Sequence, residues 1–259
     1  MTCPPLVAVA HGSRDPAGQR TVEELLDVVR ARRPGIDVRV AYVQNADPAL
    51  PQVLAGLAGL AAVPAHPSAK GAVVVPLLLS RGYHVAVDIA RAVAAHGGTV
   101  TPPLGPDPLL TEALAGRLAE AGVPARAPVV LAAAGSSDPS AAADVEAQAA
   151  ELAERRGAPV VAAYASALAP AVADAVRLLR PAGTAGAPSV GVAVATYLLA
   201  PGRFANSVRA CAVEAGATWV SDPLGAHPAL ADLVLRRHLA APAAGTVSGA
   251  ARYVVARGR

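Results

Sequence analysis

Cysteines and aromatic residues are both scarce in this chain of 259 residues. The two cysteines, Cys3 and Cys211, are far apart, and neither belongs to a CxxC pair. This count excludes a disulfide framework, a zinc knuckle and a four-cysteine iron–sulfur cluster. Aromatic residues make up only 3% of the chain, with one Trp and one Phe, so few rings are present on which nucleic-acid bases could stack.

Charge is also sparse, because charged residues make up 16% of the chain and the net charge is only +3. Proteins that bind nucleic acid by neutralising phosphates carry more positive charge than this, so nucleic acid is not an expected partner. Apolar residues make up 54% of the chain, which excludes disorder and predicts a sizeable buried core. The balance still suits a small anionic ligand bound by a few arginines.

Long hydrophobic runs are missing as well. The longest uncharged stretch, residues 181–202, is broken by glycines and prolines, which makes it a poor membrane span. The first residues lack the basic segment of a signal peptide. We therefore expect a cytoplasmic protein without a membrane partner.

Short apolar runs alternate with segments whose apolar residues recur at helical spacing, which predicts right-handed βαβ units. The expected strands are residues 6–10, 38–43, 73–79, 129–133, 160–164 and 190–196. The helical segments of the first half are residues 21–33, 50–60, 85–95 and 111–121. The strand runs are almost continuously apolar, as in a parallel sheet covered by helices on both faces.

The chain is also a repeat of itself. Four segments of the first half recur in the same order 120 to 123 residues later: 6–16, 40–50, 78–85 and 103–110. We therefore predict an α/β fold of two tandem, duplicated βαβ domains, each with a central mostly parallel sheet flanked by helices. The predicted domains are residues 1–124 and 125–259, joined within the stretch 122–128.

The repeat separates shared scaffold residues from residues that only one half carries. His11 is replaced by Ala134 in the second half, and His84 is replaced by Phe204. Both histidines follow a predicted strand, where open α/β sheets bind ligands. A single histidine at such a place is usually structural, but the joint loss of both favours a functional pair that holds a metal ion or a proton.

Residues beside the two histidines have both structural and functional interpretations. Ser13 and Asp15 before a proline predict the capped start of a helix, and the second half repeats this pattern. The amides of Gly12 and Ser13 could also bind a carboxylate or phosphate.

Two arginines and a glycine also flank the histidines. Arg14 and Arg81 are replaced in the second half and could clamp a carboxylate, although a lone arginine is usually solubilising surface. Gly82 predicts a turn or a close backbone approach beside His84.

The other histidines are predicted to be structural or solvated. His66 and His96 fall at loop or helix-end positions, and His238 falls in an apolar helix. His227 takes the place of Asp107 in the repeat, so lining the same cleft is a second possibility for it.

Two motifs together resemble the CbiX/SirB-type sirohydrochlorin chelatases. They are HGSRDP at residues 11–16 and PLLLSRGYHVAVDI at residues 76–89, and the long members of this family are themselves two fused copies. The resemblance covers essentially the whole chain. It implies an ATP-independent lyase that inserts Fe²⁺ or Co²⁺ into sirohydrochlorin, in sirohaem or cobalamin biosynthesis, with the metal as substrate and no nucleotide.

The resemblance also assigns the site. His11 and His84 would be the metal-binding and catalytic pair. The tetrapyrrole-binding residues that we expect are Gly12, Ser13, Arg14, Tyr42, Gln44, Ser80, Arg81, Gly82 and Tyr83. Family members often have an acidic residue near Gln44, so the resemblance does not extend to a carboxylate at this position. The second half would complete the tetrapyrrole cleft, and a monomer with pseudo-twofold internal symmetry is expected.

Other functions remain open at this point. A non-catalytic tetrapyrrole or metal carrier on the same fold would need the same histidines, and a vestigial cleft is a third possibility. The histidine phosphatases also place a reactive histidine after their first strand, but their opening is Arg-His-Gly, and Ala10 precedes His11 here. Ligand type does not choose between iron, cobalt and nickel; we expect iron.

Overall fold

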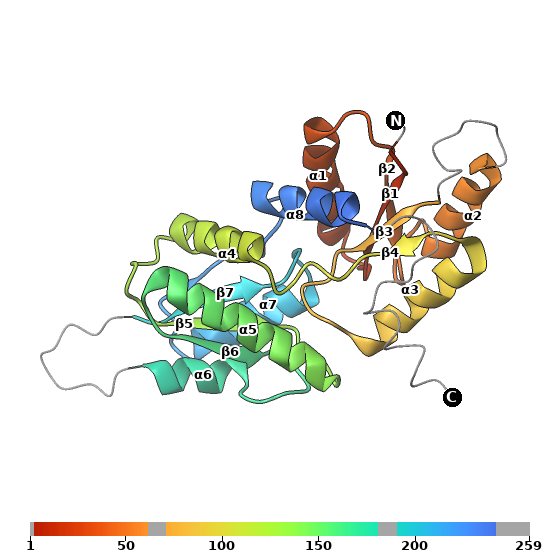
Figure 1. Ribbon diagram of the computed structural model, residues 1–259. Helices are drawn as coiled ribbons and strands as arrows, with labels where there is room; N and C mark the ends of the chain where they lie inside the picture. The colour runs from red at the N-terminus through yellow and green to blue at the C-terminus, as the bar shows by residue number, and fades with distance from the viewer. Residues whose placement is uncertain (1–2, 62–70, 181–190, 242–259) are drawn as a thin grey trace, which may run out of the picture. The chain divides into compact units, whose positions relative to one another are not determined.

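The computed structural model describes residues 3–61, 71–180 and 191–241. It contains two compact units. The first is formed by the chain up to Leu104 together with the chain from Leu230, and the second is Gly105–Ala229. Each unit holds one four-stranded sheet with helices on both faces (Figure 1), which confirms the predicted fold class.

All strands of the first unit are parallel, in the order β2-β1-β3-β4. The strands are β1 (Leu6–Ala10), β2 (Val38–Tyr42), β3 (Val73–Pro76) and β4 (Thr99–Val100), and the helices between them are α1 (Pro16–Arg32), α2 (Leu50–Ala61) and α3 (Tyr83–His96). Leu6 is in register with both Val38 and Val73. The carboxyl ends of β1, β2 and β3 therefore lie at one edge of the sheet.

The second unit repeats this arrangement, with the strand order β6-β5-β7-β8 and all pairs parallel. Its strands are β5 (Val129–Ala133), β6 (Val160–Tyr164), β7 (Ala193–Tyr197) and β8 (Trp219–Val220). Its helices are α4 (Pro108–Glu120), α5 (Pro139–Arg156), α6 (Val172–Leu179) and α7 (Arg203–Glu214). The identical strand order confirms that the sequence repeat is a repeat of structure.

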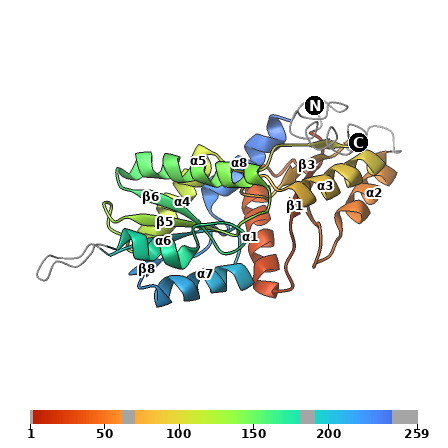
Figure 2. The same ribbon diagram turned by 90° about the horizontal axis from the view of Figure 1, so that it is seen from below.

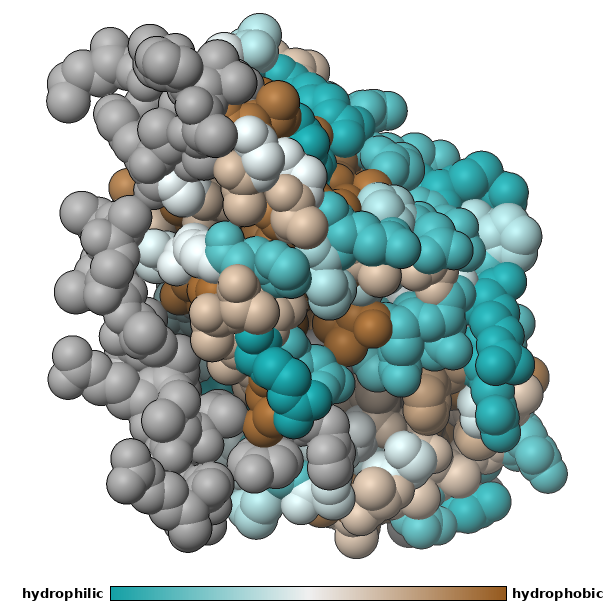
Figure 3. All heavy atoms as spheres, turned by 90° about the vertical axis from the view of Figure 1, so that its right-hand side faces the viewer, coloured by the Kyte–Doolittle hydropathy of each residue, from teal (hydrophilic) through white to brown (hydrophobic). Residues whose placement is uncertain are grey.

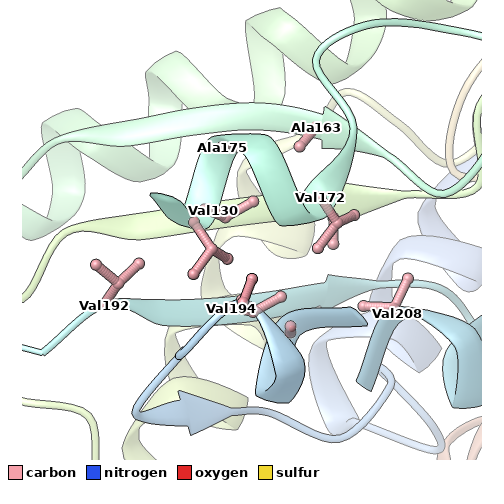
Figure 4. Close-up of a cluster of buried hydrophobic side chains, with 11 residues drawn as sticks. Val130, Ala163, Val172, Ala175, Val192, Val194 and Val208 are labelled. Carbon is pink, nitrogen blue, oxygen red and sulfur yellow. The ribbon is translucent and has the colours of Figure 1, made fainter. Parts of the chain in front are cut away.

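One hydrophobic cluster of the second unit lies between its sheet and the helices α6 and α7. Val130 and Val194 project from neighbouring strands toward Val172 of α6 and Val208 of α7 (Figure 4), and all four are at most 2% exposed. Burying a valine side chain contributes about 1.5 kcal/mol or more to stability. The apolar strand runs therefore have the packing that the sequence predicts.

Three helices start at an Asp-Pro pair, as the sequence predicts for two of them. Asp15, Asp107 and Asp138 each accept a hydrogen bond from the backbone N–H two residues later, at 2.9, 3.0 and 2.9 Å. The proline that follows each aspartate occupies the first helical position, where no N–H is needed. These caps start α1 five residues before the expected 21–33 and α4 three residues before the expected 111–121.

The last helix of each repeat belongs to the unit of the other repeat. Helix α4 packs on α5 and β7 of the second unit, and α8 (Pro228–Leu239) lies, from Leu230 onward, in the first unit. In Figures 1 and 2, α8 runs beside α1, and an ion pair of 3.2 Å joins Asp232 to Arg32. The division into 1–124 and 125–259 stays a prediction about the sequence repeats.

The strands differ from expectation at their ends. Strand β3 stops at Pro76 instead of residue 79, and the last bond toward β1 runs from the Leu77 N–H to the Val9 carbonyl at 2.7 Å. Strand β7 runs from Ala193 to Tyr197, whereas 190–196 was expected, and residue 190 is outside the described part. The two-residue strands β4 and β8 are too short to give a pattern in the sequence.

The described surface is mixed in character. The hydrophobic residues on the face drawn in Figure 3 are scattered among hydrophilic ones. Among the described residues, none of the helices has the length and apolar content needed to cross a membrane.

Candidate functional site

The carboxyl edge of the first sheet brings together the segments that carry the predicted site residues. His11 follows β1 directly, Gln44 follows β2 by two residues, and residues 77–82 lead from β3 to α3. His11 and Gln44 are both exposed. The strand order β2-β1-β3 therefore places the β1 loop between the other two.

His11 and Gln44 are in direct contact. The side-chain amide nitrogen of Gln44 lies 2.8 Å from Nε2 of His11, and the Gln44 backbone N–H donates to the His11 carbonyl at 3.1 Å. The contact pairs one ring nitrogen with the Gln44 side chain, and which of the two groups donates depends on the tautomer of His11. The contact orients the His11 ring.

Gly12 allows this close approach. Its φ is +97°, and a Cβ at this position would overlap the Gln44 carbonyl. Any other residue would push the β2 loop away from His11, since both the positive φ and the missing side chain are required.

The second unit has the same backbone with different side chains. Gly135 has φ +92° and would overlap the Ser166 carbonyl if it carried a Cβ. Ser166 stands where Gln44 stands in the first unit, and its hydroxyl donates to the carbonyl of Ala134 at 2.9 Å. The loop geometry is therefore scaffold, and the imidazole–amide pair is specific to the first unit.

The segment around Ser13 and Asp15 is the capped helix start that the sequence predicts. The Asp15 N–H donates to Ser13 Oγ at 3.0 Å, and the Gln19 side chain donates to the Ser13 carbonyl at 2.8 Å. Arg14, between them, is exposed at the same edge. This places a cation within three residues of His11.

The segment after β3 agrees only in part with expectation. Arg81 is exposed and Ser80 is half-buried. Gly82 has φ −154°, which any residue adopts, and nothing lies within 4 Å of where its Cβ would be. The expected need for glycine as a turn or close approach is therefore wrong at Gly82.

Two predicted site residues lie in the first turn of α3. The structure describes the helix backbone at Tyr83 and His84, but their side chains are outside the described part. Among the described side chains, no cluster of three or more His, Cys, Asp or Glu is present.

Among the predicted site residues whose side chains are described, Tyr42 is the most deeply buried. It ends β2 and is only 3% exposed. Burial, with a smaller effect of the Glu23 carboxylate, raises the pKa of its hydroxyl. The phenol is therefore neutral at physiological pH.

The remaining histidines are placed as follows. His238 is 3% exposed, and its Nε2 lies 2.9 Å from the Pro4 carbonyl, so the prediction of a structural residue is confirmed. His96 ends α3, and His66 is outside the described residues. The Nδ1 of His227 accepts a hydrogen bond from the Ala229 N–H at 3.2 Å, so this nitrogen is engaged at the start of α8.

A comparison with protein-family models finds one match, repeated along the chain. The model described as CbiX matches residues 5–121 and again residues 128–241. The break between the two matches falls within the join that the sequence predicts.

Solved structures with the same fold cover almost the whole chain. SirB from Bacillus subtilis with Fe³⁺ is 23% identical, with a TM-score of 0.70, over 91% of this chain and 94% of that chain. DR2241 from Deinococcus radiodurans is 24% identical, with a TM-score of 0.65, over 92% of this chain and 55% of that chain. These similarities show the chelatase fold.

One curated relative shares part of the sequence. It is the sirohydrochlorin cobaltochelatase of Methanosarcina acetivorans, 26% identical over 84 residues. The match covers 32% of this chain and 59% of that protein.

Proposed function

The chain belongs to the CbiX family, and from this premise we propose that it is a sirohydrochlorin chelatase. The enzyme would insert Fe²⁺ or Co²⁺ into sirohydrochlorin without a nucleotide, in sirohaem or cobalamin biosynthesis. The relative from Methanosarcina acetivorans is named for cobalt insertion, and Bacillus subtilis SirB is described with Fe³⁺ and with cobalt.

One observation carries the proposal beyond family membership. The pair formed by His11 and Gln44 stands at the carboxyl edge of the first sheet, whereas Ala134 and Ser166 occupy the same backbone in the second unit. The scaffold alone does not require a histidine there. This difference between the two units supports the proposed chemical role of the His11 imidazole.

His11 and His84 are the proposed metal ligands and catalytic residues. Neutral imidazole binds Fe²⁺, Co²⁺ and Ni²⁺. Two pyrrole N–H protons must leave sirohydrochlorin as the divalent ion enters, and imidazole accepts protons near neutral pH. Gln44 is the proposed positioning residue, because it fixes the His11 ring without adding a charge.

The substrate would be bound by residues beside this pair. Sirohydrochlorin carries several carboxylates, and the exposed Arg14 and Arg81 offer guanidinium groups to them. The amides of Gly12 and Ser13 are further donors. Ser80, Gly82, Tyr83 and the buried Tyr42 complete the proposed binding residues.

Iron is the proposed physiological metal, and a monomer is the proposed state. The iron proposal rests on a single compact site in a sequence without a His-rich tract for metal storage. The monomer proposal rests on the two copies of the fold that each chain carries. The alternative is a carrier, which would bind the pigment or metal and stop at one equivalent.

Anaerobic visible spectroscopy of sirohydrochlorin with Fe²⁺, and separately with Co²⁺, tests the proposal. Wild type should turn over many equivalents, and His11→Ala and His84→Ala should each lose at least about a hundredfold in kcat/KM. His96→Ala, a histidine at the far end of α3, is the matched control and should keep full activity.

Two other results would overturn the assignment. Folded wild type that does not exceed the rate of metal alone is not a sirohydrochlorin chelatase. Pigment binding that saturates at one equivalent without turnover identifies the carrier.

A further inference from the structure

Four helices begin at a polar residue followed by proline, and one of the four differs from the rest. Helices α1, α4 and α5 are capped by Asp15, Asp107 and Asp138. Helix α8 has His227 in the same position, and its Nδ1 accepts from the Ala229 N–H at 3.2 Å. An imidazole therefore performs in α8 the function that a carboxylate performs in the other three.

The neighbouring helix is shaped around this imidazole. Gly116 of α4 leaves the necessary space, since a Cβ there would lie 2.8 Å from Nε2 of His227. Arg117, the next residue, donates to the Leu224 carbonyl at 2.8 and 3.0 Å and pairs with Glu120 at 2.6 Å. The loop that carries His227 is thus fastened to α4.

In the described part of the chain, the charged groups that act on the pKa of His227 are Arg117, Glu120 and Glu112, which all belong to α4. Burial lowers the pKa of the imidazole, and Arg117 lowers it further. The carboxylates of Glu120 and Glu112 act in the opposite direction with smaller effect. The neutral ring, which the cap needs, is the form that these surroundings favour.

We propose that His227 is a protonation-controlled cap, which holds the start of α8 when the imidazole is neutral and releases it when the imidazole is protonated. Nδ1 accepts a hydrogen bond only through its lone pair, and a proton there sets N–H against the Ala229 N–H. The imidazolium also places a positive charge at a helix N-terminus, which the helix dipole disfavours. The aspartate caps lack both effects.

The direction of the pH effect follows from the lowered pKa. A histidine that binds its proton less readily in the folded state stabilises that state fully above its ordinary value of about 6.5. The stabilisation is lost as the pH falls from there through the folded-state pKa. The cap therefore releases on mild acidification.

Helix α8, whose first turn is released, is the helix that completes the first unit. Further along α8, Arg237 donates to the carbonyls of Pro103 and Leu104 at 3.1 and 2.9 Å, and Asp232 pairs with Arg32. These contacts keep the end of α8 in place when its first turn opens. Mild acidification is thus expected to open the cap at residues 227–229 before the rest of α8 unfolds.

Hydrogen exchange of the full chain, measured by mass spectrometry between about pH 5 and pH 8, tests the proposal. Protection factors, corrected for the intrinsic pH dependence, are compared for wild type, His227→Asn and His227→Ala. Asparagine caps helices without titrating. Wild type should match His227→Asn near pH 8 and fall about fivefold toward His227→Ala near pH 5, as expected when one N-cap is lost.

The proposal would be overturned if the protection factors of wild type and His227→Asn changed with pH in the same way over this range. His238, a buried histidine within α8, is present in every variant and cancels in the comparison. NMR of wild type alone gives an independent decision. The His227 ring and the Ala229 amide should titrate with one midpoint, and an Ala229 amide that ignores the ring would contradict the cap.

Discussion

At the scale of residues, the two halves differ in side chains while their loops keep one backbone. Gly12 and Gly135 both have positive φ and both face a carbonyl of the loop after the next strand. Asn45 and Ala167, in those loops, also share a positive φ, of 61° and 65°. Because the backbone is the same, exchanges of His11 and Gln44 test chemistry rather than folding.

The Gln44 amide is expected to support activity by holding the His11 ring. Gln44→Ala should lower kcat/KM for metal insertion about tenfold, the lower end of the loss seen when a partner of a metal-binding histidine is removed. Ser166→Ala removes the corresponding side chain of the second unit and should leave kcat/KM within about twofold. Anaerobic steady-state kinetics with the metal varied measures both. A faster Gln44→Ala enzyme would instead mean that the amide competes with the metal for Nε2.

Single residues also show where sequence reasoning succeeds and where it stops. The repeat identified His11 as a candidate and the family resemblance added Gln44, but nothing in the sequence indicated that their side chains touch. That contact depends on the register of β1 and β2 and on Gly12. Similarly, His227 was recognised as the counterpart of Asp107, whereas its role as a cap became visible only with the Ala229 contact.

At the scale of elements, helix starts are determined locally and can be measured separately. Asp15→Ala should lower the free energy of unfolding by about 1 kcal/mol, since the Ala17 N–H loses its acceptor. Asp138→Ala should cost at least as much, because Asp138 also accepts from the Ser140 hydroxyl at 2.7 Å. Urea unfolding of both variants measures the two costs. Asp15→Asn is the control, and a loss in it equal to that of Asp15→Ala would show that capping is not the cause.

Elements with a strong local signal were predicted, and those set by their neighbours were not. Strands β1, β5 and β6 have the predicted bounds, because each is a continuous apolar run. The edge strands β4 and β8 contain two residues each and exist through pairing with β3 and β7. Pairing of this kind leaves no pattern in the sequence.

At the scale of the whole molecule, each compact unit is completed by the last helix of the other repeat. Two equivalent arginines mark the exchange. Arg117 of α4 donates to the Leu224 carbonyl, and Arg237, its counterpart 120 residues later, donates to the Leu104 carbonyl. The sequence repeat shows which segments correspond, but it does not show which copy a helix packs against.

The compact unit, rather than the sequence repeat, is therefore expected to fold alone. Helix α4 contributes the leucines Leu110, Leu114 and Leu118 to the core of the second unit, each fully buried. Their burial is worth about 5–9 kcal/mol in total, which is comparable to the stability of a typical domain. Within the same unit, Gln148 of α5 donates to the Thr111 hydroxyl of α4 at 2.6 Å.

Two fragments of similar length separate the two divisions of the chain. Residues 105–229 keep α4 and should unfold in one cooperative urea transition. Residues 125–241 lack α4, leave the face of α5 and β7 uncovered, and should bind a hydrophobic dye and unfold without a sharp transition. The fragment with the more cooperative urea transition identifies the folding unit. If residues 125–241 fold as cooperatively as residues 105–229, the exchanged helix is dispensable and the repeat boundary near residue 124 is the domain boundary.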